Sequence, residues 1–64
     1  MLRFLERQGF ELRRVNGSHH LMRKEDVQTV VPVHGNQNLK IGTLRGILRD
    51  IDLNPEDFEH RWSQ

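Results

Sequence analysis

Residues 10–23 read Phe-Glu-Leu-Arg-Arg-Val-Asn-Gly-Ser-His-His-Leu-Met-Arg, and this stretch decides the fold. Apolar and charged residues alternate over 10–15, which is the period of a half-buried β-strand. The Asn16-Gly17 pair favours a hairpin turn, because both residue types accept the positive φ that a type I′ turn requires. The chain then returns as a second strand over 18–23. The sequence therefore predicts an antiparallel hairpin with two histidines directly after its turn.

The segments outside this hairpin predict one more strand and three helices. A short amphipathic helix over 2–8 ends at Gly9, a residue suited to the position after a helix. A valine-rich strand occupies 27–33, and its Pro32, which cannot donate a ladder hydrogen bond, marks an edge or the strand's end. Apolar residues at helical spacing predict a helix over about 41–51, with Asn38 as its cap.

Asn54-Pro55 begins a short final helix, because Asn favours the cap and Pro the first helical position. The order α-β-β-β-α plus this helix predicts an α+β fold whose three-stranded antiparallel sheet is covered on one face by the first two helices. Gly42 and Gly46 weaken the long helix, so we expect them to pack closely on the sheet. The predicted core is Leu5, Phe10, Leu12, Val31, Leu44, Leu48 and Phe58.

Length and composition restrict the class of protein. With 64 residues, 34% hydrophobic residues and no cysteine, the chain predicts one small domain over residues 1–64 with a thin core and no disulfide or thiolate metal site. No apolar run approaches the roughly 18 residues of a membrane span, and no signal peptide is visible. We therefore expect a cytoplasmic protein without a membrane partner.

Charge is distributed unevenly along the chain. Residues 1–49 hold nine Lys and Arg against four acids, a net charge of +5, whereas residues 50–64 hold one Arg against five acids, a net charge of −4. A basic body favours a polyanionic partner. The alternative is an ordinary solvated surface with local ion pairs, each of which contributes little.

Three motifs follow one another in a specific order: Gly17-Ser18-His19, then residues 31–35 (Val-Pro-Val-His-Gly), then Gly42-Thr43-Leu44. This order closely resembles the HicA family of bacterial toxins, small endoribonucleases of type II toxin–antitoxin pairs, over about residues 2–58. The resemblance implies a double-stranded-RNA-binding-like fold, mRNA as substrate and a HicB-type antitoxin as partner. Relatives usually begin a turn or two earlier, so the first helix is expected to be short.

His19 matches the catalytic histidine of that family. The 2′-hydroxyl of RNA is an internal nucleophile, and cleavage needs a base, an acid and positive charge near the phosphorus. Histidine suits either proton transfer near neutral pH. Without the resemblance, His19 is better explained as a polar residue beside the turn.

His20 points to the opposite face of the strand from His19, so the pair cannot chelate one metal. We expect a structural role for His20, no metal site and no cofactor. His34 follows the third strand, and it is either the second proton carrier or a loop histidine without a role.

Several other residues are candidates for contact with RNA. Lys40 and Thr43 lie near the start of the long helix, where free N–H groups favour anions, although a capping role explains Thr43 slightly better than a phosphate contact. Gly17 allows close approach of a partner. The full RNA-binding set predicted is Gly17, Ser18, Arg13, Arg14, Arg23 and Lys40.

Two other function classes remain open from the sequence. The chain is an mRNA-cleaving toxin, a non-catalytic RNA-binding module of the same fold, or an interaction protein whose only ligand is its antitoxin. RNA cleavage in the presence of EDTA would identify a metal-independent toxin. An adjacent antitoxin gene would favour the toxin or the interaction protein over the RNA-binding module.

Overall fold

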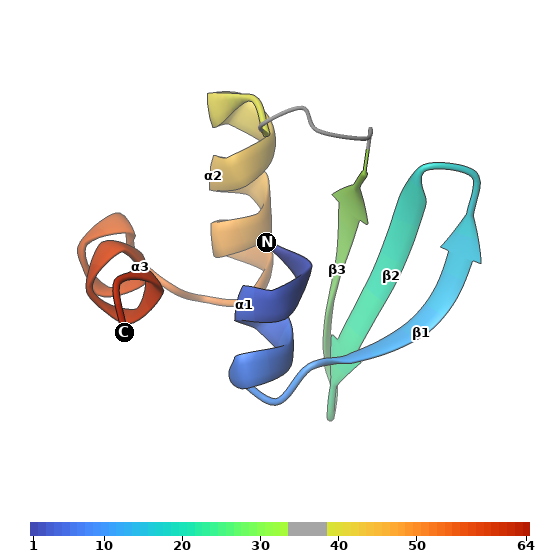
Figure 1. Ribbon diagram of the computed structural model, residues 1–64, viewed down its shortest axis with the longest axis horizontal. Helices are drawn as coiled ribbons and strands as arrows, with labels where there is room; N and C mark the ends of the chain where they lie inside the picture. Colours follow the sequence, from blue (N-terminus) through green and yellow to red (C-terminus); the bar gives the residue numbers. More distant parts are fainter. Residues whose placement is uncertain (34–38) are drawn as a thin grey trace.

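The computed structural model describes residues 1–33 and 39–64 and confirms the α+β class with three antiparallel strands between helices (Figure 1). The elements are α1 (Leu2–Arg7), β1 (Glu11–Asn16), β2 (His19–Lys24), β3 (Val27–Pro32), α2 (Ile41–Asp50) and α3 (Pro55–Trp62). In this described part of the chain, no helix is long and apolar enough to cross a membrane.

The sheet has the order β1-β2-β3 and two faces of different character. Side chains alternate between the faces along each strand. Met22, Thr29 and Val31 are buried beneath the helices, and we call their side the inner face. Their strand neighbours Arg23 and Val30 are exposed on the outer face. Figure 1 shows α1 and α2 on one side of the sheet, and the other helix or strand elements that the structure describes leave the opposite side open.

The core lies between the inner face and the helices. Its buried apolar residues are Phe4, Leu5, Phe10, Met22, Val31, Ile47 and Leu48. The sequence prediction was correct for four of them, and Leu44 and Phe58 are only half-buried. Leu12 was predicted wrongly, since its side chain is 49% exposed. It lies opposite Met22 on the inner face, but the helices cover β2 and β3, and every residue of β1 is exposed.

The end of α1 confirms the predicted role of Gly9. This residue has φ +98°, a conformation that glycine adopts without steric cost. Its N–H donates to the carbonyl of Glu6 at 3.0 Å, and the N–H of Phe10 donates to the carbonyl of Leu5 at 2.9 Å. These two bonds form a Schellman motif. They direct the chain from the helix into the hairpin and bring Phe10 and Leu5 into the same core.

The turn of the hairpin lies one residue later than predicted. Asn16 pairs with His19 as the last rung of the ladder, so the two-residue loop is Gly17-Ser18 rather than Asn16-Gly17. Gly17 has φ +60°, and neither Asn16 nor Ser18 has a positive φ. A positive φ at the first loop position alone is typical of a type II′ turn, in which glycine is favoured at that position.

The start and the exposed side of α2 differ from the prediction. Lys40 is the N-cap and makes no side-chain capping bond, and the predicted cap Asn38 lies outside the described residues. A Cβ built on Gly42 or Gly46 would have no atom of the described residues within 4 Å. Neither glycine packs against the sheet, so that expectation was wrong. The buried Thr29 joins α2 to β3 instead, donating its hydroxyl hydrogen to the Asp50 carboxylate at 2.9 Å.

The final helix begins as the sequence predicts. The Asn54 side chain accepts a hydrogen bond from the Asp57 N–H at 2.8 Å, and Pro55 is the first helical residue. The helix packs on α1 through three aromatic rings: Phe4 lies 5.1 Å from Phe58 and 5.6 Å from Trp62, measured between ring centroids. These contacts give α3 a fixed place on the helical side of the molecule.

Candidate functional site

His19 is the first residue of β2 and stands directly after the Gly17-Ser18 loop. It pairs with Asn16 on one side and with Pro32 on the other. The N–H of Val33 donates to the Ser18 carbonyl at 2.6 Å, which ties the loop to the end of β3. The His19 side chain is exposed, so its imidazole is accessible at a backbone position that hydrogen bonds hold on both sides.

His20 has the structural environment that the sequence predicts. It is half-buried on the inner face, opposite Val15 and Val31. Its Nδ1 lies 3.3 Å from the backbone carbonyl of Ser18, a distance that suits a hydrogen bond when this nitrogen carries the proton. The two adjacent histidines therefore belong to opposite faces, and only His19 is presented on the open one.

A β-bulge gathers arginines on the face of His19. Simple alternation would send Arg13 and Arg14 to opposite sides of the sheet. The register shifts between Leu12 and Arg14, so that Arg14 pairs with Leu21, an outer-face residue. Arg13 forms an ion pair with Glu11 at 3.7 Å, and Glu11 is itself opposite Arg23. Both arginines therefore share the outer face, as expected of a bulge, which changes the direction of side chains.

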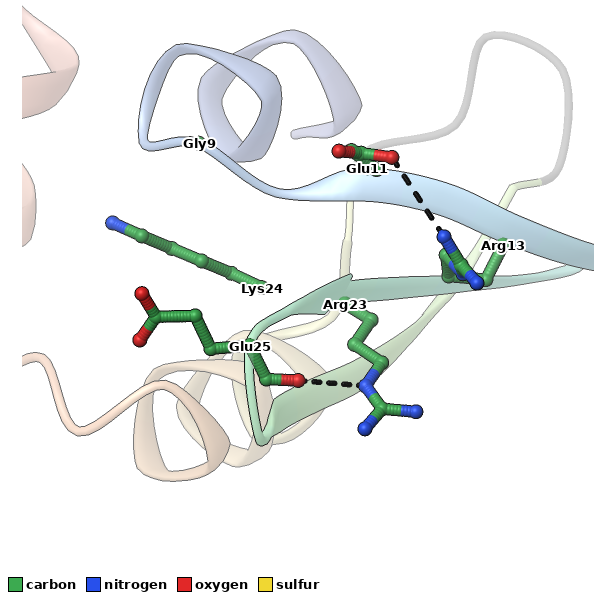
Figure 2. Close-up of a pocket in the computed structure, with 6 residues that line it drawn as sticks. All are labelled: Gly9, Glu11, Arg13, Arg23, Lys24 and Glu25. Carbon is green, nitrogen blue, oxygen red and sulfur yellow. Dashed lines mark hydrogen bonds and ion pairs between the residues drawn. The ribbon is translucent and has the colours of Figure 1, made fainter.

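Arg23 lies on the same face, four residues beyond His19 along β2. Its Nε donates to the carbonyl of Glu25 at 2.7 Å. Figure 2 shows Arg13 and Arg23 at an open groove that is also lined by Gly9, Glu11, Lys24 and Glu25. The structure thus brings three arginines of the predicted set to one face. His19 is at one end of this face and Arg23 is at the other.

Lys40 comes from a different layer. It is exposed at the N-cap of α2, and Figure 1 places this helix start at the same end of the molecule as the β1–β2 turn. Thr43 is half-buried in the first turn of α2 and makes no side-chain hydrogen bond within the described residues, so the predicted cap is not found there. His34 lies outside the described residues.

One titratable group on the helical side of the molecule has a shifted pKa. The pKa of the Met1 α-amino group is lowered, mainly because burial disfavours its charged form and also because Arg7 is nearby. On the outer face, charge comes from exposed guanidinium groups. Sequence reasoning missed the contribution of Glu11 and Glu25 to the groove, because nothing local in the sequence indicates that these two residues line the same groove.

The outer face can therefore supply one exposed imidazole, which exchanges protons, and several cations that attract an anionic backbone. Against known protein families, residues 1–53 match the family described as HicA toxin of bacterial toxin-antitoxin. The chain belongs to the HicA toxin family. The match extends from α1 through α2 to the turn after α2, so α3 lies beyond it. No curated protein and no solved structure matches this HicA chain.

Proposed function

We propose that this HicA protein is a metal-independent endoribonuclease that cleaves mRNA in the cytoplasm, with His19 as a general acid or base. The observation that carries the proposal is the exposed His19 at the fixed start of β2, on the face where the bulge places Arg14. Family membership supports a toxin of a toxin–antitoxin pair. The full chain, residues 1–64, is taken as one toxin domain that includes α3.

The proposed reaction uses the RNA's own 2′-hydroxyl. Its oxygen attacks the adjacent phosphorus while a base removes its proton, and the bond to the 5′-oxygen breaks as an acid protonates that oxygen. The products are a 2′,3′-cyclic phosphate and a 5′-hydroxyl. His19 supplies one of these two proton transfers, and His34 is the candidate for the other. No step of this scheme requires a metal or a cofactor.

Positive charge near His19 would stabilise the phosphorane transition state. Arg14 is the nearest candidate in the ladder, because its partner Leu21 is two residues from His19 on the same face. The loop at Gly17-Ser18 leaves room for the sugar-phosphate backbone, as no atom of residues 1–33 and 39–64 lies within 4 Å of a Cβ built on Gly17. Arg13, Arg23 and Lys40 complete the proposed RNA contacts.

The proposed protein partner is a HicB-type antitoxin. We expect it to neutralise the toxin by covering the His19 edge and the basic outer face. The location is chosen because the described residues leave the outer face open, whereas helices cover the part of the inner face formed by β2 and β3.

The decisive experiment compares the wild-type protein with His19→Ala on a labelled single-stranded RNA in the presence of EDTA. The proposal predicts cleavage by wild type, cyclic-phosphate ends on the products, and no cleavage by the variant. Wild-type protein that binds RNA without cutting it would instead identify a binding module. Protein that binds only the antitoxin would identify an interaction protein.

A further inference from the structure

The groove at the far end of the hairpin has a chemical character of its own. It is lined by Gly9, Glu11, Arg13, Arg23, Lys24 and Glu25, and none of these residues is adjacent to His19 in the ladder. Three cations face two carboxylates. One of those carboxylates, on Glu11, is engaged by Arg13 at 3.7 Å, and the Lys24 ammonium is held by the Gln8 carbonyl at 2.8 Å.

Arg23 is the cation in this groove that is best prepared to bind a ligand. Its Nε bond to the Glu25 carbonyl at 2.7 Å fixes one edge of the guanidinium. Figure 2 shows the two terminal nitrogens turned away from the other five lining residues. A guanidinium held in this way presents a planar pair of donors, the geometry that matches the oxygens of a phosphate.

The groove and His19 are aligned along a single strand. His19 and Arg23 are both outer-face residues of β2, and four residues of a strand span about 13 Å. We propose that the terminal nitrogens of Arg23, on the outer face beside this groove, bind a second, uncleaved phosphate of the same RNA strand whose scissile phosphate lies at His19. This inference rests on the proposed function and adds a subsite to it.

The subsite predicts that the enzyme prefers RNA longer than a dinucleotide. A dinucleotide has one phosphodiester and cannot occupy both positions, whereas a longer single strand can run along the outer face and reach both. Within residues 1–33 and 39–64, the outer face has no Phe, Tyr or Trp for base stacking, and its exposed apolar members are aliphatic, such as Val30. Recognition in this groove is therefore of the phosphate backbone and independent of base identity.

The experiment measures kcat/KM for a mixed-sequence decanucleotide and for a mixed-sequence dinucleotide, and takes their ratio. Arg23→Ala is expected to lower this ratio about tenfold, chiefly through KM, and Arg23→Lys to restore part of it, because lysine keeps the charge and loses the planar pair. Arg49→Ala, which removes an exposed arginine from α2, is the matched control and should leave the ratio unchanged. Circular dichroism confirms that each variant is folded.

Binding is measured in parallel with an uncleavable 2′-O-methyl decanucleotide over a series of salt concentrations. Loss of one phosphate contact should reduce the slope of log K against log salt by about 0.7 for a single strand. If Arg23→Ala left both the kcat/KM ratio and the salt slope unchanged, the subsite would be overturned. If Arg23→Ala lost only its binding to the antitoxin, the subsite would also be overturned, and the groove would be assigned to a protein contact. If wild type binds but cleaves neither substrate, the endoribonuclease proposal fails, and the salt slope alone decides the subsite.

Discussion

The two faces of the sheet use the same strands for different purposes. Along β2, His20 and Met22 point toward the helices, and the alternate residues His19, Leu21 and Arg23 point away from them. The inner residues are held by packing, as the 1% exposure of Met22 shows. Among the described residues no helix covers the outer side chains, and they are held by the backbone ladder and, for Arg23, by a hydrogen bond to the Glu25 carbonyl. The comparison teaches that this small protein can change its outer face with little effect on stability, while its inner face has no such freedom.

The largest expected effect is the loss of RNA cleavage when His19, on the outer face, is replaced. His19→Ala should lower RNA cleavage by about 10²–10⁴-fold, the usual contribution of a general acid or base, and leave the melting temperature unchanged. His60→Ala removes another exposed histidine, from α3, and should retain full activity. Full toxicity of His19→Ala in an induction test would contradict the catalytic assignment.

Two leucines on the inner side compare a position that the helices cover with one that they leave exposed. Leu48→Ala should destabilise the protein by about 2–5 kcal/mol because it empties a site in the core, where Leu48 is 4% exposed. That loss can unfold a domain of this size, whose total stability is commonly about 3–5 kcal/mol. Leu12→Ala, on the uncovered part of the same face, should change stability by only about 0.5 kcal/mol. Equal denaturant midpoints for the two variants would disprove this account of the helical layer.

Neighbouring residues of β3 give a smaller contrast. Thr29→Ala removes the buried hydroxyl that donates to Asp50 and should cost about 1–2 kcal/mol in chemical unfolding. Gln28→Ala changes the adjacent, exposed position and should stay within about 0.5 kcal/mol of wild type. A loss at Gln28 as large as that at Thr29 would show that the outer face also carries packing energy.

The smallest effect concerns the solvent side of α2. Gly46→Ala should raise stability by about 1 kcal/mol, because alanine is the better helix former and the added Cβ meets no atom within 4 Å in the part of the chain that the structure describes. Thermal melting measures the gain directly. A lower melting temperature would mean that some neighbour does limit the space at this helix.

The order of elements was predictable because its signals are local. Gly9 could end α1 and Asn54 could begin α3 on short-range chemistry alone, and both do so. Strand alternation predicted that His19 and His20 lie on opposite faces of the sheet, and the pairing of β2 with β1 and β3 confirms this.

Two kinds of feature could not be predicted from the sequence: how far the helices extend across the sheet, and where a strand contains one extra residue. The alternation that places Leu12 on the inner face is correct, but nothing local says how far the helices reach across it. The bulge after Leu12 is invisible in the pattern, yet it decides that Arg13 and Arg14 share a face. The turn was displaced by one residue because Asn16-Gly17 and Gly17-Ser18 are both acceptable hairpin loops. The role of each candidate site residue stays a prediction.

The aromatic contact between α1 and α3 gives the protein its own optical probe. Trp62 is the single tryptophan of the chain, and its ring lies 5.6 Å from Phe4 and 5.5 Å from Phe58 while remaining 47% exposed. Its fluorescence therefore reports whether α3 is seated on α1, on the helical side of the molecule. Emission measured during unfolding follows the release of this helix, and a ligand confined to the outer face leaves the signal in place.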